Sequence, residues 1–199
     1  MGTRSLTRVI PVDGNEVLDI DSLKNAKEKD ISKHAEKFYI ALAKYVKSHT
    51  MDGSPKGSLI NLYRQYDGHM YGHGLDLADF LKDLKVVNGI SSKLKATDKI
   101  ANGAECLSAQ LVSHFKKEAG GFYLMKFKDE VGAYAEEYIY NIYVVSFTLS
   151  ATNTKFLIHV SVNDVYKDER DPNKYTFYSD VSHFLDDAKG GLKKMSSTF

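Results

Sequence analysis

Residues 136–149 read EEYIYNIYVVSFTL, a long stretch in which tyrosine, isoleucine and valine predominate. Aromatic and β-branched residues favour β-strands. Both alternating sets of side chains are largely apolar or aromatic: Tyr138, Tyr140, Ile142 and Val144 on one face, and Ile139, Asn141, Tyr143 and Val145 on the other. A strand covered on both faces is central in its sheet or covered by a partner chain. We therefore expect a sheet built around this segment.

Further strands are predicted on both sides of this segment in the sequence. TKFLIHVSV (154–162) follows it closely, and the polar residues 153–154 between them indicate a hairpin. Residues 3–10 alternate polar and apolar side chains and form a strand that we expect to end at Pro11 and the turn at residues 13–14. The other predicted strands are SLINLYRQY (58–66), GFYLMKF (121–127) and a short one near 176–178.

Apolar residues at helical spacing predict helices between these strands. An amphipathic helix within residues 21–50 separates two strands that could otherwise pair as a hairpin, so we interpret it as an insertion. A second helix begins at Leu75 and is expected to stop around residues 88–89, before a polar loop over 90–104. A third runs from Ala104 towards residues 120–121, and a terminal helix precedes a flexible tail at 190–199.

These elements predict a single α+β domain over residues 1–199, with an antiparallel sheet and helices packed on one face. The chain has 199 residues, enough for one domain with a full hydrophobic core. The N-terminus lacks a signal-peptide core, and no apolar run approaches the roughly 20 residues of a membrane span. With Cys106 as the only cysteine, no internal disulfide is possible, and a reducing compartment fits best. We expect a cytoplasmic protein with no membrane partner.

The charge balance disfavours general nucleic-acid binding. Lysine and arginine number 27 against 26 aspartate and glutamate residues, which gives a net charge of +1. Proteins that live on nucleic acid normally carry a clear basic excess, because phosphate contacts supply most of that affinity. A local basic cleft remains compatible with these numbers.

Several sequence blocks together carry a resemblance. They are GTRSLTRV at the N-terminus, LYRQYDG followed by GHGLDLADFL, then NGAECLSAQLVSHFK, and GGFYLM ahead of EEYIYNIYV. This combination resembles an uncharacterised family of small proteins from phages, large viruses and bacteria, over residues 2–10 and about 59–144. If the protein is viral, the host cytoplasm is the expected location. The helix within 21–50 and the segment HMYGHG, where the family has a proline-containing turn, depart from the pattern, and the resemblance implies a grouping without an activity.

Residues 63–74, YRQYDGHMYGHG, are the strongest candidate for a ligand site. Gly72 and Gly74 precede a helix, whose N-terminus offers unpaired N–H groups and partial positive charge to an anion. Arg4 and Arg64 could add bidentate contacts to a phosphate or carboxylate. The expected ligand-binding set is Arg4, Arg64, Tyr66, Asp67, Gly72, His73 and Gly74.

The same residues also have an ordinary structural interpretation. Asp67 followed by Gly68 is a common turn, and the glycines can serve only to allow positive backbone angles. Asp76 already places a carboxylate at the start of the helix, and the segment matches neither the phosphate-loop nor the dinucleotide fingerprint.

Catalytic and metal-binding patterns are incomplete. His69 and His73 are four residues apart, with Asp67 or Asp76 as further ligands, which keeps a metal-dependent hydrolase as an alternative. Cys106 and His114 lie eight residues apart on one predicted helix, about 12 Å, too far for proton transfer between them. We expect no cofactor and no metal.

The leading hypothesis is thus a non-enzymatic binding protein that captures a small anionic ligand such as a nucleotide. The second is a structural or interaction module, forming a homo-oligomer or binding a host protein through its tyrosine-rich sheet or the inserted helix. Thirteen tyrosines and no tryptophan suit an interface as well as a core.

Overall fold

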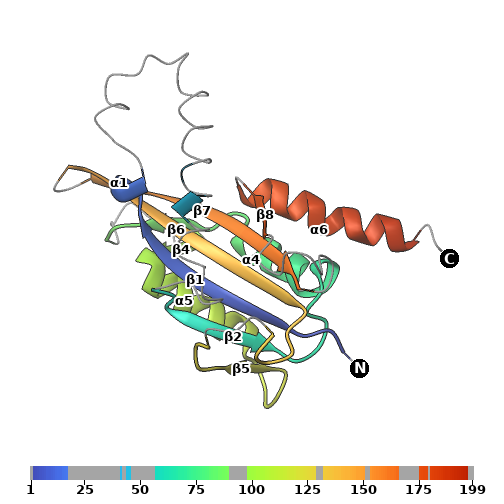
Figure 1. Cartoon of the computed structure of the whole chain (residues 1–199). Helices are drawn as coiled ribbons and strands as arrows, with labels where there is room; N and C mark the ends of the chain where they lie inside the picture. Colours follow the sequence, from blue (N-terminus) through green and yellow to red (C-terminus); the bar gives the residue numbers. More distant parts are fainter. Residues whose placement is uncertain are drawn as a thin grey trace.

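The computed structural model describes residues 2–17, 41, 44–45, 57–89, 98–128, 132–150, 153–165, 175–178 and 180–196. It confirms the α+β class (Figure 1). A six-stranded sheet has the order β5-β2-β1-β6-β7-β8. Its strands are β1 (Ser5–Asp13), β2 (Ile60–Arg64), β5 (Phe122–Leu124), β6 (Tyr138–Ser150), β7 (Asn153–Asp164) and β8 (Tyr175–Tyr178).

The tyrosine-rich strand β6 is central in this sheet, as its two apolar faces predict. It pairs antiparallel with β7 in a long hairpin, from Tyr138 opposite Asp164 to Ser150 opposite Asn153. On its other side it pairs parallel with β1, so the sheet is mostly rather than wholly antiparallel. β1 and β2 are antiparallel neighbours although residues 18–56 separate them in the sequence. This pairing agrees with an insertion between two strands of one hairpin.

Helices cover one face of the sheet (Figure 1). They are α4 (Leu75–Leu81), α5 (Gly103–Phe115) and α6 (Val181–Ser196). Leu77, Leu107 and Phe184, one from each helix, are fully buried in a core with Tyr140 and Ile142 of β6. Burial of each such side chain stabilises the fold by roughly 1.5–3 kcal/mol. The sheet and these three helices therefore share one main core.

The opposite face of the sheet is unusually polar for a buried surface. Asn61, Arg8, Asn141 and Ser161 lie side by side on four adjacent strands, and each is at most 2% exposed. Arg8 Nε donates to Asn61 Oδ1 at 3.2 Å, and Asn141 Nδ2 donates to Ser161 Oγ at 3.3 Å. Buried polar groups are costly unless they are hydrogen-bonded, and these lateral bonds meet part of that requirement, while Asn141 Oδ1 has no partner.

Strand β1 continues through Pro11, where the sequence predicts its end. Val9 O accepts from Leu59 N, so the backbone groups of Val9, and of Pro11 two residues on, point towards β2. The β1–β2 ladder ends at Val9 opposite Ile60, so no donor is needed at position 11. Proline is tolerated at such an unpaired edge position.

Two predicted helix ends are wrong. α4 ends at Leu81, well before residues 88–89, because Asp83 takes a positive φ of 113° and the chain then forms strand β3 (Lys85–Val87). β3 pairs parallel with β4 (Ile100–Asn102), which the sequence analysis assigned to a loop. The adjacent β-branched residues Val86 and Val87 favour this strand over a longer helix. α5 ends at Phe115 rather than near residues 120–121.

Some predictions concern residues outside the described ranges. Of the expected helix within 21–50 the structure describes only residues 41 and 44–45, and it shows Tyr45 against the cluster of Ile10, Val12, Tyr143 and Val145. A short helix α1 (Gly14–Val17) precedes that region. α6 reaches Ser196, so most of the tail predicted at 190–199 is helical. The described part of the chain has no helix long and apolar enough to cross a membrane.

Candidate functional site

The segment YRQYDGHMYGHG folds as a turn that leads directly into α4. Asp67 has a positive φ of 53°, and residues Met70–Gly74 form a π-helical turn (η2) that continues into α4 without a break. His73 N donates to Asp67 O at 2.8 Å, which closes the turn. π-helical turns of this kind are rare and are frequent at functional sites.

His73 is the centre of a buried hydrogen-bond network. Its side chain is fully buried, with Nε2 2.7 Å from Thr7 Oγ1 and Nδ1 3.2 Å from Arg64 Nη1. Because the guanidinium can only donate, Nδ1 must accept, and the ring proton therefore lies on Nε2 and is donated to Thr7. The network thus selects one tautomer of a neutral imidazole.

The surroundings of His73 hold it neutral. Burial and the nearby Arg64 charge lower the pKa of His73 from 6.5 to about 3. Phe115 and Tyr140 meet the ring edge-on, at centroid distances of 4.9 and 5.5 Å. His73 is thus a structural link between β1, β2 and α4 rather than an exposed binding group.

Arg64 is held by several contacts at once. Its Nε donates to Tyr66 O at 2.7 Å, and its Nη1 donates to Asp76 Oδ2 at 2.8 Å as well as to His73. The guanidinium also lies 5.3 Å from the ring centroid of Phe122. The side chain is 17% exposed. The ion pair with Asp76 therefore already offsets part of the charge that an anion would meet here.

The two glycines of the proposed cradle are required by packing. A Cβ atom on Gly72 would lie 2.5 Å from Asp67 O, and one on Gly74 would lie 3.1–3.2 Å from Met70 Sδ and the Tyr140 ring. Tyr140 approaches this closely because its hydroxyl donates to Gly68 O at 2.9 Å. Close contacts within the turn, at Gly72, and with β6, at Gly74, therefore account for these glycines without a ligand.

The remaining predicted site residues do not converge on Arg64. Ser5 pairs with Arg64 in the β1–β2 register, so alternation places Arg4 on the other face of the sheet. There the Arg4 charge acts on the Tyr63 hydroxyl, although burial is the larger effect and leaves the pKa of Tyr63 raised. Tyr66 is 54% exposed. The structure thus brings Arg64, Asp67, Gly72, His73 and Gly74 together in one turn and leaves Arg4 apart.

Among the described residues, the structure brings no third metal ligand to His69 and His73. The His69 ring stacks on Tyr71 at 3.7 Å between centroids, while His73 is committed to Thr7 and Arg64. Among the described residues no group of three or more His, Cys, Asp or Glu side chains gathers as a metal site would require. Cys106 Sγ accepts a weak hydrogen bond from Gln110 Nε2 at 3.6 Å.

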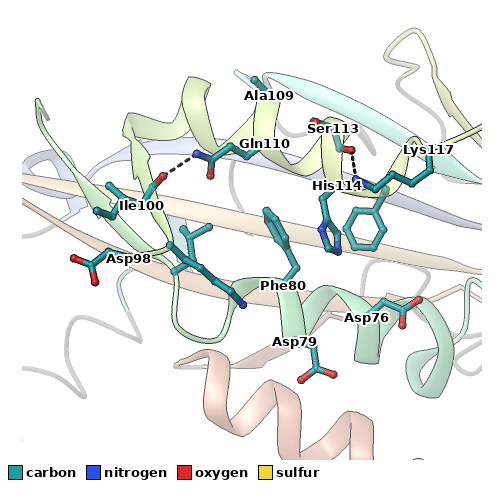
Figure 2. Close-up of a pocket in the computed structure, with 13 residues that line it drawn as sticks. Asp76, Asp79, Phe80, Asp98, Ile100, Ala109, Gln110, Ser113, His114 and Lys117 are labelled. Carbon is teal, nitrogen blue, oxygen red and sulfur yellow. Dashed lines mark hydrogen bonds between the residues drawn. The ribbon is translucent and has the colours of Figure 1, made fainter. Parts of the chain in front are cut away.

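An open groove of about 940 Å³ lies beside this network, between α4, β4 and α5 (Figure 2). Asp76 belongs to both, because it pairs with Arg64 and lines the groove. Phe80 projects from α4 towards Gln110 and His114 on α5 (Figure 2). The groove is lined by Asp76, Asp79, Phe80, Leu84, Asp98, Lys99, Ile100, Ala109, Gln110, Ser113, His114, Phe115 and Lys117.

The floor of the groove is aromatic. The His114 ring lies 4.8 Å from the Phe80 ring at a tilt of 37°, and 4.8 Å from the Phe115 ring in an edge-on arrangement. Phe80 and Phe115 are partly buried against the main core, which fixes their positions. Such a floor offers π-faces to a flat ligand.

Lys99 and Lys117 line the groove together with His114. Partial burial, Lys117 and Lys99, in that order of effect, lower the pKa of His114, and Asp76 opposes them weakly. At neutral pH the imidazole is therefore neutral. Both lysines thus lie near the same ring, beside the aromatic surface of the groove.

Three aspartates, Asp76, Asp79 and Asp98, line the same groove as the two lysines. Asp76 pairs with Arg64 at 2.8 Å and Asp79 with Lys82 at 3.6 Å, and Figure 2 shows Asp79 directed away from Phe80. Lys117 Nζ donates to Ser113 O at 2.9 Å. In the described ranges, no carboxylate forms an ion pair with Lys99 or Lys117.

The sequence analysis did not find this groove. His114 was considered only as a base for Cys106, and Lys99 lies in a segment assigned to a loop. The available signal was a basic and aromatic run, SHFKK at 113–117, at the end of a helix. Its pairing with Phe80 depends on how α4 and α5 pack, which no local pattern encodes.

The chain matches no protein-family model, no curated protein and no solved structure. The site must therefore be interpreted from its own geometry.

Proposed function

We propose that the protein is a non-enzymatic binding protein that holds a small anionic ligand with a planar ring, such as a nucleotide, in the α4–α5 groove. The ligand class is the one expected from the sequence, but the groove replaces the turn at 63–74 as the site. The observation that carries the proposal is that Lys99 and Lys117 line the same groove as His114, which itself forms part of an aromatic floor.

The chemistry of the groove suits such a ligand. A base or similar ring would stack on Phe80 and His114, where the neutral imidazole accepts stacking without charge repulsion. A phosphate or carboxylate group would lie between the two ammonium groups. Gln110 donates its amide to Ile100 O at 2.7 Å, which orients its carbonyl oxygen as an acceptor for a ring N–H. The volume lies within the usual range for small-molecule sites, roughly 300–1,000 Å³.

Asp76 links the groove to the predicted turn. The Arg64–His73 network fixes the π-helical turn and hence the start of α4, which carries both Asp76 and Phe80. In this proposal the residues at 63–74 position the site, and those of α4 and α5 contact the ligand.

Calorimetric titration tests the proposal with four probes: AMP, ATP, adenosine and inorganic phosphate. We expect AMP or ATP to bind more tightly than adenosine or phosphate, because only the nucleotides offer both a ring and an anion. In the Lys99→Gln/Lys117→Gln variant, affinity should fall at least about tenfold, as loss of charge-assisted contacts implies. Lys189→Gln, which removes an exposed lysine on α6 outside the groove, is the control and should bind like the wild type.

Two results would count against the proposal. Absence of binding by all four probes at millimolar concentration would remove the nucleotide class, and equal loss in the Lys189→Gln control would show that the effect is not local to the groove. Hydrolysis of ATP during the titration would instead favour the metal-dependent hydrolase alternative.

A further inference from the structure

The two sides of the sheet differ in how their edge backbone groups are satisfied. β5 forms one edge. Gln65 N donates to Gly121 O and Met125 N donates to Asn61 O, so the odd-numbered residues here direct their backbone groups to β2. The backbone N–H and C=O groups of Phe122 therefore point away from β2. Its N–H donates to Gly120 O at 2.7 Å, and its carbonyl accepts from Lys116 Nζ at 2.8 Å. Lysine cover and local bonds of this kind protect an edge strand against pairing with another chain.

Among the described residues, no strand is hydrogen-bonded to the edge of β7 between residues 154 and 158, although β3 packs close to β7. Val165 N donates to Glu137 O, so odd-numbered residues of β7 direct their backbone groups to β6 and even-numbered residues direct them to the other side. There β8 pairs only with the stretch from Val160 to Asn163. Within the described ranges, Thr154, Phe156 and Ile158 have no backbone hydrogen-bond partner on this side.

An apolar groove of about 1,010 Å³ lies along this open edge. Phe156 and Ile158 form one wall, and Leu84 and Val86, from the end of α4 and from β3, form the opposite wall. All four are only partly buried against the main core. Leu157, which also lines the groove, is 45% exposed. The groove therefore offers apolar contacts next to unpaired backbone groups.

Both ends of the groove are closed. At one end Asn88 Nδ2 donates to Thr154 Oγ1 at 3.3 Å, which ties the chain after β3 to the start of β7. At the other end Asp180 accepts from His183 N at 2.9 Å and caps α6 where β8 would otherwise continue along β7. The open length is thus about five residues, or roughly 17 Å of extended chain.

We propose that residues 154–158 of β7 dock an extended segment of another protein, which adds to the sheet as a strand next to β8. Its backbone would pair with Thr154, Phe156 and Ile158, and every second side chain would enter the apolar groove. Three lysines, Lys82, Lys85 and Lys155, line the groove against two aspartates, Asp83 and Asp180. This excess of one positive charge means that the segment that fits best has alternating apolar residues and at least one carboxylate. This proposal is independent of the nucleotide site.

A second copy of the chain fits this edge poorly. If two β7 strands paired antiparallel about Phe156, Val160 of one copy would face residue 152 of the other, within its β6–β7 turn. β8 already occupies the position beside Val160. A short segment without a neighbouring hairpin avoids this clash.

The test uses two synthetic ten-residue peptides, one with valine and glutamate in alternation and one of the same composition with a central proline. Amide hydrogen exchange of the full chain is measured with each. We expect the first peptide to slow exchange at the amides of Thr154, Phe156 and Ile158, and the proline peptide to leave them unchanged. Thr154→Pro, which removes an outward N–H, should weaken binding at least about fivefold relative to Thr154→Val, which keeps that N–H.

Three outcomes would overturn the proposal. The first is no binding of the alternating peptide at millimolar concentration. The second is protection of amides elsewhere without effect on residues 154–158. The third is protection of these amides in the free protein: if it depends on concentration a second copy occupies the edge, and if it does not, another part of the chain does.

Discussion

Arg64 donates a hydrogen bond to Nδ1 of His73 across 3.2 Å, inside a network that leaves the imidazole neutral. A histidine beside a permanent cation looks like a candidate for binding or catalysis when only the sequence is known. Here the pair holds the π-helical turn against β1 and β2 and thereby places α4. Its role is to position the groove between α4 and α5.

The depressed pKa of His73 predicts acid-sensitive folding. The folded-state pKa of about 3 lies below the unfolded value of about 6.5, so the unfolded chain binds the extra proton between these values. His73 therefore adds to the free energy of unfolding above pH 6.5, and this contribution is lost as the pH falls. The free energy of unfolding then decreases by up to about 1.4 kcal/mol per pH unit. Urea unfolding from pH 7 to pH 5 should show a steeper loss for the wild type than for His73→Gln. Thr7→Val, which keeps the titrating ring, should retain the wild-type slope.

Substitution of Arg64 should be far more damaging than substitution of its ion-pair partner. Arg64→Ala leaves His73 Nδ1 and Tyr66 O without their donor and should reduce the free energy of unfolding by about 1–3 kcal/mol. Asp76→Asn removes a surface charge that is 54% exposed and should change it by less than about 1 kcal/mol. Chemical denaturation at pH 7 measures both. Equal effects would contradict the anchoring role of Arg64.

Two glycine-to-alanine substitutions should change the stability of the fold in opposite directions. Gly72→Ala would place a methyl group 2.5 Å from Asp67 O, a contact with backbone that cannot move aside easily, and should destabilise the fold by more than about 1 kcal/mol. Gly190→Ala in α6 meets nothing within 4 Å and should stabilise it by about 0.5–1 kcal/mol. Thermal unfolding of the two variants gives the comparison. A tolerated Gly72→Ala would mean that the turn is looser than described.

The hydroxyl of Tyr140 should contribute measurably to stability. It donates to Gly68 O in the core, and Tyr140→Phe leaves that buried carbonyl unpaired, at a cost of about 1–2 kcal/mol. Tyr66→Phe changes an exposed ring and serves as the control, with an expected change within about 0.5 kcal/mol. Similar values for both variants in urea unfolding would show that the Gly68 contact is unimportant.

The sheet was largely predictable because its signals are local. The two apolar faces of 138–145 predict a central strand, and β6 is central. The hairpin with β7 follows from the short gap between two strand-forming runs. Pro11 was misinterpreted because its tolerance depends on where β2 begins, which is a property of a neighbouring strand.

The candidate site was less predictable because it depends on how distant elements pack together. The sequence pointed to Arg64, His73 and Gly72, which lie together, but it could not show that they satisfy one another. Exposure decides whether a histidine binds a ligand or supports a turn, and exposure comes from tertiary packing. His114 and Phe80 are 34 residues apart, and only the packing of α4 and α5 brings their rings to 4.8 Å.

The most direct test of the groove is the NMR signal of the His114 ring during titration with AMP. The proposal predicts that the His114 ring resonances shift progressively and saturate, while those of His183, an exposed residue on α6 outside the groove, stay constant. The same titration with the Lys99→Gln/Lys117→Gln variant should produce a much weaker shift. AMP binding that leaves the His114 signal unchanged, or no binding at millimolar concentration, would contradict the assignment of the groove as a nucleotide site.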